Sequence, residues 1–132
     1  MGYDKKYLLF ALTYAAIGMG LGIYMGMSQD HGQFVTHAHI LLVGFAVSFI
    51  YGVIHKLWLE SASAGMSMAQ MLVHQISAVV MLAGLFLMFG KIVPEETAGP
   101  ILGIASIGVL IGMLLMIAMV LRATAANSAS SV

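Results

Sequence analysis

Residues 34–58, FVTHAHILLVGFAVSFIYGVIHKLW, form the most informative stretch of the chain. Lys56 is the one residue of this stretch with a formal charge, and most of the others are apolar. An α-helix needs about 20 consecutive apolar residues to cross the hydrocarbon core of a bilayer. The stretch therefore predicts a membrane-spanning helix, and that helix carries three histidines, His37, His39 and His55.

Three further apolar runs of similar length cover about residues 7–27, 69–89 and 101–121. The chain of 132 residues is 61% hydrophobic and only 8% charged, whereas a soluble domain is about 25% charged. The runs are continuously apolar and do not alternate, which disfavours a β-barrel. We predict an all-α, integral membrane bundle of four transmembrane helices. It forms a single domain over residues 1–122 and is followed by a flexible C-terminal tail at 123–132.

The few charged residues indicate partners and orientation. Five Lys and Arg balance five Asp and Glu, so the chain has no basic patch for nucleic acid, and its expected partner is the lipid bilayer. The chain has no Cys, which excludes thiolate metal sites and a covalently attached c-type haem. Positive residues favour cytoplasmic loops. Both termini should be cytoplasmic, because one side of the four-helix model carries all but one of the basic residues, namely Lys5, Lys6, Lys56 and Arg122.

The second span sorts its polar residues onto faces if it is a regular helix. His37 and His39 then point about 160° apart, so they serve different sites. One stripe combines His37 with Gly44, Ser48, Tyr51 and His55, and the third span carries a matching stripe of Gln70, His74, Ser77, Met81, Gly84 and Met88. In an antiparallel hairpin, His74 would lie near the level of Tyr51, Gln70 near His55, and Met88 near His37. The pattern predicts a polar seam through the depth of the bundle.

Histidines inside a membrane span are costly and are usually functional. Haem iron takes axial His or Met in an apolar slot between helices, and a nearby glycine makes room for the macrocycle. We predict His37 and His39 as metal ligands, with Gly44, His74 and Met88 as further residues that contact the cofactor. His74 could instead be an interhelical hydrogen bonder, and His55 a residue at the level of the lipid headgroups. His31 is expected in a loop.

Two other functions fit the same residues. Copper prefers imidazole or thioether ligands, so a copper-handling protein could use two clusters, Met25, Met27 and His31, and Met66, Met68 and Met71. A methionine that simply fills gaps in the core is the plainer interpretation of these clusters. The second alternative is a non-redox small transporter or accessory subunit. In that case the seam relays protons or holds the helices together.

The run Val35–His39, Gly44 and the run Phe49–His55 together resemble a helix of subunit I of the haem–copper oxidases. That superfamily includes the cbb3-type oxidases and the nitric oxide reductases. In the tenth helix of that subunit, a His-x-His pair sends one imidazole to each of two haems on opposite faces, and a glycine follows. The resemblance implies a haem b protein of the bacterial inner (cytoplasmic) membrane. Such a protein would carry electrons with a redox partner protein, or bind dioxygen or nitric oxide.

The resemblance also implies a homo-oligomer, because subunit I consists of three arcs of four helices. A trimer is favoured, in which His37 of one chain and His39 of its neighbour hold a haem. A dimer could hold the haem with His37 and Met88, or with His37 from both chains. Subunit I binds copper through a histidine cluster, and here only His74 lies on a comparable helix. The resemblance therefore does not extend to a dinuclear haem–copper site, and it leaves open whether the chain is an enzyme.

Overall fold

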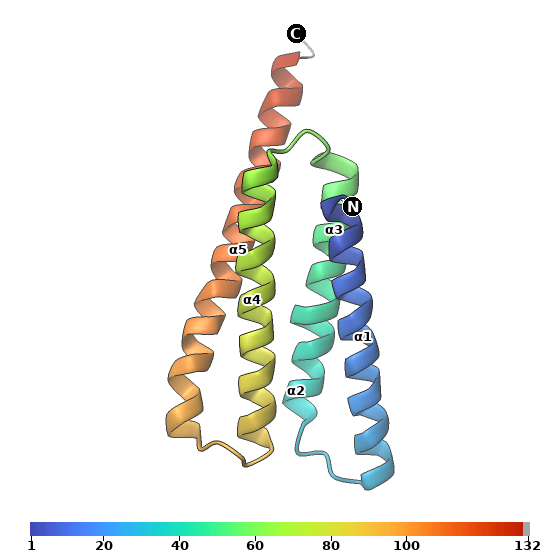
Figure 1. The fold of residues 1–132 in the computed structure, drawn as a ribbon, viewed down its shortest axis with the longest axis vertical. Helices are drawn as coiled ribbons and strands as arrows, with labels where there is room; N and C mark the ends of the chain where they lie inside the picture. The colour runs from blue at the N-terminus through green and yellow to red at the C-terminus, as the bar shows by residue number, and fades with distance from the viewer. Residues whose placement is uncertain (131–132) are drawn as a thin grey trace.

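The computed structural model describes residues 1–130, and over these residues it contains helices and no strands (Figure 1). The second span is divided by a π-helical segment, so the chain forms four spans from six elements. In order they are α1 (Tyr3–Ser28), α2 (Phe34–His39), η1 (Ile40–Ala46), α3 (Val47–Trp58), α4 (Ala64–Phe89) and α5 (Glu95–Ser130). The prediction of an all-helical chain with four long apolar helices is confirmed.

The four spans run up and down as two neighbouring hairpins (Figure 1). In the first hairpin α1 packs against η1 and α3, and in the second α4 packs against α5. The hairpins meet where α2 and η1 contact α4, and where α3 contacts α5. The start of α1 and the end of α5 lie at the same end of the bundle (Figure 1), which we call the terminal end. The loops 29–33 and 90–94 lie at the opposite end.

Three helices, α1, α4 and α5, are longer than the sequence predicted. The α4 helix begins at Ala64, because the Ser63 side chain caps it by accepting a hydrogen bond from the Met66 N–H at 3.2 Å. The α5 helix continues to Ser130, so residues 123–130 are helical where we expected a flexible tail. Alanine, the strongest helix former, recurs in this segment and favours its continuation. The rest of the expected tail, residues 131–132, lies outside the described residues.

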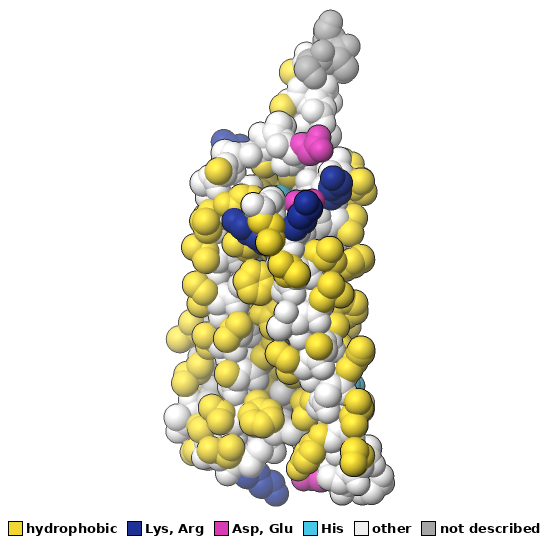
Figure 2. Space-filling model, turned by 45° about the vertical axis from the view of Figure 1, so that its right-hand side comes forward, with side chains coloured by type: hydrophobic (Ala, Val, Ile, Leu, Met, Phe, Trp, Pro, Cys, Tyr) yellow, Lys and Arg dark blue, Asp and Glu magenta, His cyan; other side chains and the backbone are white. Residues whose placement is uncertain are grey.

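The face of the bundle in Figure 2 is largely apolar between its ends, and the charged side chains on this face gather near the two ends. Large apolar side chains are exposed along all four spans. All four spans are long and apolar enough to cross a membrane. Several buried side chains, in contrast, are polar: Thr36, Ser48, His55, Ser67, Gln70, His74 and Gln75. This distribution is typical of a multi-pass membrane protein, in which lipid replaces water around the apolar faces.

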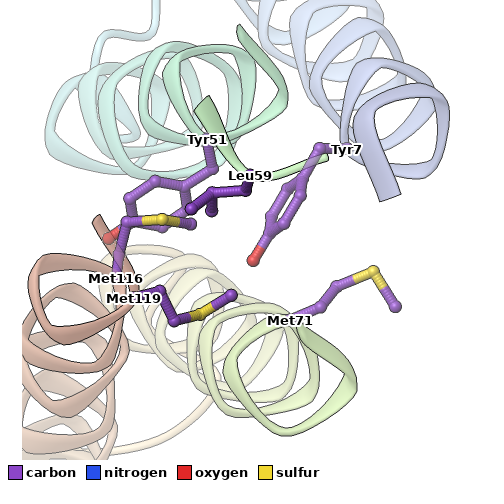
Figure 3. Packing of buried hydrophobic residues seen from close by; sticks show 6 residues of the cluster. All are labelled: Tyr7, Tyr51, Leu59, Met71, Met116 and Met119. Atoms are coloured by element: carbon purple, nitrogen blue, oxygen red, sulfur yellow. The ribbon is translucent and has the colours of Figure 1, made fainter. Parts of the chain in front are cut away.

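The packing near the terminal end combines aromatic rings with methionines from all four spans (Figure 3). Its buried members are Tyr7, Tyr51, Leu59, Met71, Met116 and Met119. The Tyr7 and Tyr51 rings meet edge to face, with their centroids 5.5 Å apart. Methionine adapts to irregular gaps, so it can fill the space that these rings leave.

The second span is not a regular α-helix, which corrects one expectation. In the π-helical segment η1, the Val47 N–H donates to the Leu42 carbonyl, five residues back. A π turn accommodates one extra residue, so it offsets the two flanking faces by about 100°. His37 consequently faces α1, whereas Ser48 faces α4. The prediction that these two residues share one stripe is wrong, because it assumed an unbroken helix.

Candidate functional site

His37 is held against α1 through one of its ring nitrogens. Its Nδ1 lies 2.9 Å from the carbonyl oxygen of Gly18, and the ring is partly buried. A carbonyl can only accept, so Nδ1 carries the hydrogen and Nε2 keeps a free electron pair. Gly22 allows this approach, because a Cβ at that position would lie 2.9 Å from Cε1 of His37. The structure thus presents His37 as an oriented imidazole whose Nε2 keeps its electron pair.

His39, on another side of α2, also contacts a backbone carbonyl through its Nδ1. Its Nδ1 lies 2.9 Å from the Val35 carbonyl oxygen of its own helix. This bond again fixes the hydrogen on Nδ1 and leaves Nε2 as the acceptor. His39 is partly exposed, and its ring hydrogen bond stays within α2, whereas His37 bonds to α1. Each of the two imidazoles is therefore oriented by a backbone carbonyl. The carbonyl belongs to α1 for His37 and to α2 itself for His39.

Gly44 provides room for a ring, and within the chain that ring is Tyr14 of α1. A Cβ at Gly44 would lie 2.6 Å from Cγ of Tyr14. The sequence prediction assigned this space to a cofactor, whereas in the structure the tyrosine occupies it. Gly44 and His37 both contact α1, so the glycine contributes to the packing beside the ligand histidine.

His74 is fully buried between helices. Its Nε2 lies 3.4 Å from the Ser48 hydroxyl, and its ring meets Tyr51 edge to face with centroids 5.0 Å apart. On the other side, a Cβ at Gly112 would lie 3.3 Å from Cβ of His74. This packing leaves no room for a flat macrocycle at the ring, so it favours the interhelical role for His74. Its Nδ1 has no hydrogen-bond partner among the described residues.

Two chains of buried hydrogen bonds connect the spans. In the first, the Tyr14 hydroxyl donates to Gln75 Oε1 at 2.8 Å, and Gln75 Nε2 donates to the Ser48 hydroxyl at 3.1 Å. In the second, the Tyr7 hydroxyl donates to Gln70 Oε1, and Gln70 Nε2 donates to the Gly112 carbonyl at 3.0 Å. Polar contacts between membrane helices fix which helix faces pair.

Part of the predicted seam exists, because Ser48, Gln70 and His74 are buried and contact polar groups of other spans. The seam also includes residues that the sequence analysis missed. Tyr7, Tyr14 and Gln75 carry three of its hydrogen bonds. One feature of the sequence could have identified Tyr7 and Tyr14. Their spacing of seven residues places them on one face of a helix.

The methionine candidates differ in their packing and exposure. Met88 packs against the cluster that Met81, Leu85 and Ala105 form between α4 and α5. Met25 is 4% exposed, whereas Met27 is 82% exposed, so these two side chains of the proposed copper cluster face opposite environments. His31 is exposed in the loop after α1. Over residues 1–130, no group of three His, Asp or Glu side chains converges as a metal site.

Comparisons of the chain with models of known protein families, with curated proteins and with solved structures found no match. The function is therefore argued from the geometry of the bundle.

Proposed function

We propose that this chain is a haem b-binding protein of the bacterial cytoplasmic membrane, with His37 as an axial ligand of the iron. The observation that carries the proposal is the 2.9 Å contact between His37 Nδ1 and the Gly18 carbonyl oxygen. Histidines that bind metals usually donate their second ring N–H to a carboxylate or a backbone carbonyl, which fixes the tautomer and the ring orientation. His37 has this arrangement, and Gly22 leaves space for its ring.

The second ligand would come from another copy of the chain. His39 is oriented in the same way as His37, but it is partly exposed and does not bond to α1. A trimer in which His37 of one chain and His39 of the next hold a haem would use both imidazoles. The apolar lateral surface of the bundle (Figure 2) offers the kind of environment that haem prefers. A dimer with two His37 ligands is the simpler variant of this arrangement.

A bound haem supplies an iron that changes between the ferrous and ferric states. The chain's own residues have distinct tasks around it. His37 binds through Nε2, the Gly18 carbonyl holds the ring in position, and the apolar side chains of the spans exclude water. With two axial histidines the protein would transfer electrons, and with one it would leave a coordination position open for dioxygen or nitric oxide.

The test compares two histidine variants purified in mild detergent from cells supplied with haem. We expect wild-type protein to show a Soret band and His37→Ala to lose most of it. His31→Ala is the matched control, because His31 lies in the neighbouring loop and is exposed. Addition of carbon monoxide to the reduced protein distinguishes an open iron, whose bands shift, from an iron with two protein ligands. Equal Soret bands in His37→Ala and wild type would contradict the assignment of the ligand.

A further inference from the structure

A small chamber lies at the terminal end of the bundle, where α1 begins, α3 ends and α4 begins. Its volume is about 290 Å³. The residues that line it mix aromatic, charged and small side chains: Gly2, Tyr3, Asp4, His55, Lys56, Leu59, Glu60, Ala62 and Ser67. We call it the His55 chamber. Its position at the helix ends corresponds to the depth at which lipid headgroups meet the hydrocarbon core.

His55 packs against two tyrosines of α1. Its ring stacks on Tyr3 and on Tyr7, with both centroid distances 5.6 Å and interplanar angles of 28° and 26°. The histidine is only 6% exposed, and its Nε2 has no hydrogen-bond partner among the described residues. A buried polar atom without a partner is costly. A ligand that pairs with this histidine would do so at the edge of the ring, where the nitrogens lie.

A second, apolar groove adjoins the chamber. It has a volume of about 170 Å³ and runs along the contact between α1 and α3. Leu8, Phe49, Gly52 and Val53 form its apolar wall, and it shares Asp4 and Lys56 with the chamber. The groove therefore leads from the polar chamber along the apolar part of the bundle. An amphipathic molecule could place a polar head in the chamber and a hydrocarbon chain in the groove.

The charged residues of the chamber indicate which kind of polar head group a ligand could place there. Asp4 and Glu60 carry carboxylates and Lys56 carries an ammonium, so the opposite charges offset one another and the chamber strongly favours neither an anion nor a cation. A neutral head with a hydrogen-bonding oxygen fits both conditions and would pair with the edge of His55. We propose that the His55 chamber and its groove bind an isoprenoid quinone or quinol, with the ring in the chamber and the first part of the tail in the groove.

This proposal goes beyond haem binding and does not depend on it. His37 and His55 are eighteen residues apart on the second span, which corresponds to roughly 25 Å. The two sites therefore lie toward opposite ends of the bundle, and each can be tested while the other is unchanged. The inference concerns binding alone and includes no electron-transfer step.

The single tryptophan of the chain provides a reporter. Trp58 lies one helical turn after His55, and quinones quench tryptophan fluorescence when they bind nearby. The experiment titrates the full-length protein in detergent micelles with decylubiquinone and follows Trp58 emission. We expect saturable quenching for the wild type. In His55→Phe the ring stack is kept but the hydrogen bond is lost, so binding should weaken about five- to tenfold. His31→Phe, at the opposite end of the bundle, should match the wild type.

A second variant distinguishes binding of the quinone ring from binding of its tail. Val53→Phe fills the groove from a position that is 37% exposed, so the bundle should keep its fold. It should weaken binding of decylubiquinone but not of the same dimethoxy-methyl-benzoquinone ring without the decyl chain. Circular dichroism and gel filtration check that each variant is folded. Equal quenching curves for wild type, His55→Phe and Val53→Phe would show that the quinone only partitions into the micelle, and would overturn the proposal. The absence of saturation would overturn it as well.

Discussion

The Nδ1 atom of His37 lies 2.9 Å from the carbonyl oxygen of Gly18, and this contact joins α2 to α1. The contact determines which ring nitrogen carries the hydrogen, and so leaves Nε2 free for a ligand. It depends on two features that lie outside the histidine itself. Gly22 leaves space for the ring, and the π-helical segment after His39 sets the rotation of α2 relative to α3.

The substitution Gly22→Ala should displace the His37 ring. The new Cβ would lie 2.9 Å from Cε1 of His37, which is closer than two carbon atoms can approach without movement. We expect the variant to bind less haem than the wild type while it stays folded, measured as Soret absorbance per chain. Gly20→Ala is the control, because a Cβ there has no neighbour within 4 Å. Equal haem content in the two variants would disprove the role of Gly22.

The substitution Tyr14→Phe should destabilise the bundle. It removes the 2.8 Å hydrogen bond to Gln75 and leaves the buried amide oxygen without its donor. We expect a loss of about 0.5–1.5 kcal/mol in the free energy of unfolding. Denaturation in mixed micelles would measure this loss. Tyr24→Phe serves as the control because Tyr24 is 56% exposed, and it should unfold like the wild type.

The substitution Gly44→Ala should destabilise the chain through overpacking. A Cβ at this position would lie 2.6 Å from Cγ of Tyr14. Tyr14 is buried, and Cγ belongs to its rigid ring, so the side chain cannot easily move aside. Such overpacking typically costs about 1–3 kcal/mol. A fall in the thermal unfolding temperature, relative to Gly26→Ala, checks the prediction, since a Cβ at Gly26 meets no neighbour within 4 Å. If both variants unfolded at the same temperature, Tyr14 would not be packed as described.

The proposed orientation can be tested with single cysteines, because the natural chain contains none. Ser61 lies in the loop at the terminal end and Asp30 in a loop at the opposite end, and both are exposed. If both termini are cytoplasmic, a membrane-impermeant maleimide should label Asp30→Cys in spheroplasts and Ser61→Cys only after lysis. The reverse pattern would contradict the orientation inferred from the basic residues.

The fold could be predicted from the sequence because each span is a continuous apolar run. The level of His74 beside Tyr51 was also predicted, and the structure confirms it with a centroid distance of 5.0 Å. The extent of α5 was underestimated, because the polar appearance of residues 123–130 conceals the helix propensity of their alanines.

The faces of the second span could not be predicted in full. A sequence pattern assigns faces from a constant rotation per residue, and the π-helical segment between His39 and Val47 breaks that constancy. His37 therefore faces α1, whereas Ser48 faces α4. The hydrogen bonds of Tyr7 and Tyr14 were missed for another reason. Their partners lie on α4, in the other hairpin, and the sequence does not show how the two hairpins pack together.

The most direct test of the central claim is the absorption spectrum of the wild-type protein, purified from haem-supplied cells and reduced with dithionite. We expect the wild-type protein to show a Soret band and resolved α and β bands of haem b. His31→Ala should keep these bands, and His37→Ala should lose them. A well-folded wild-type protein without a Soret band would contradict the proposal that this chain binds haem.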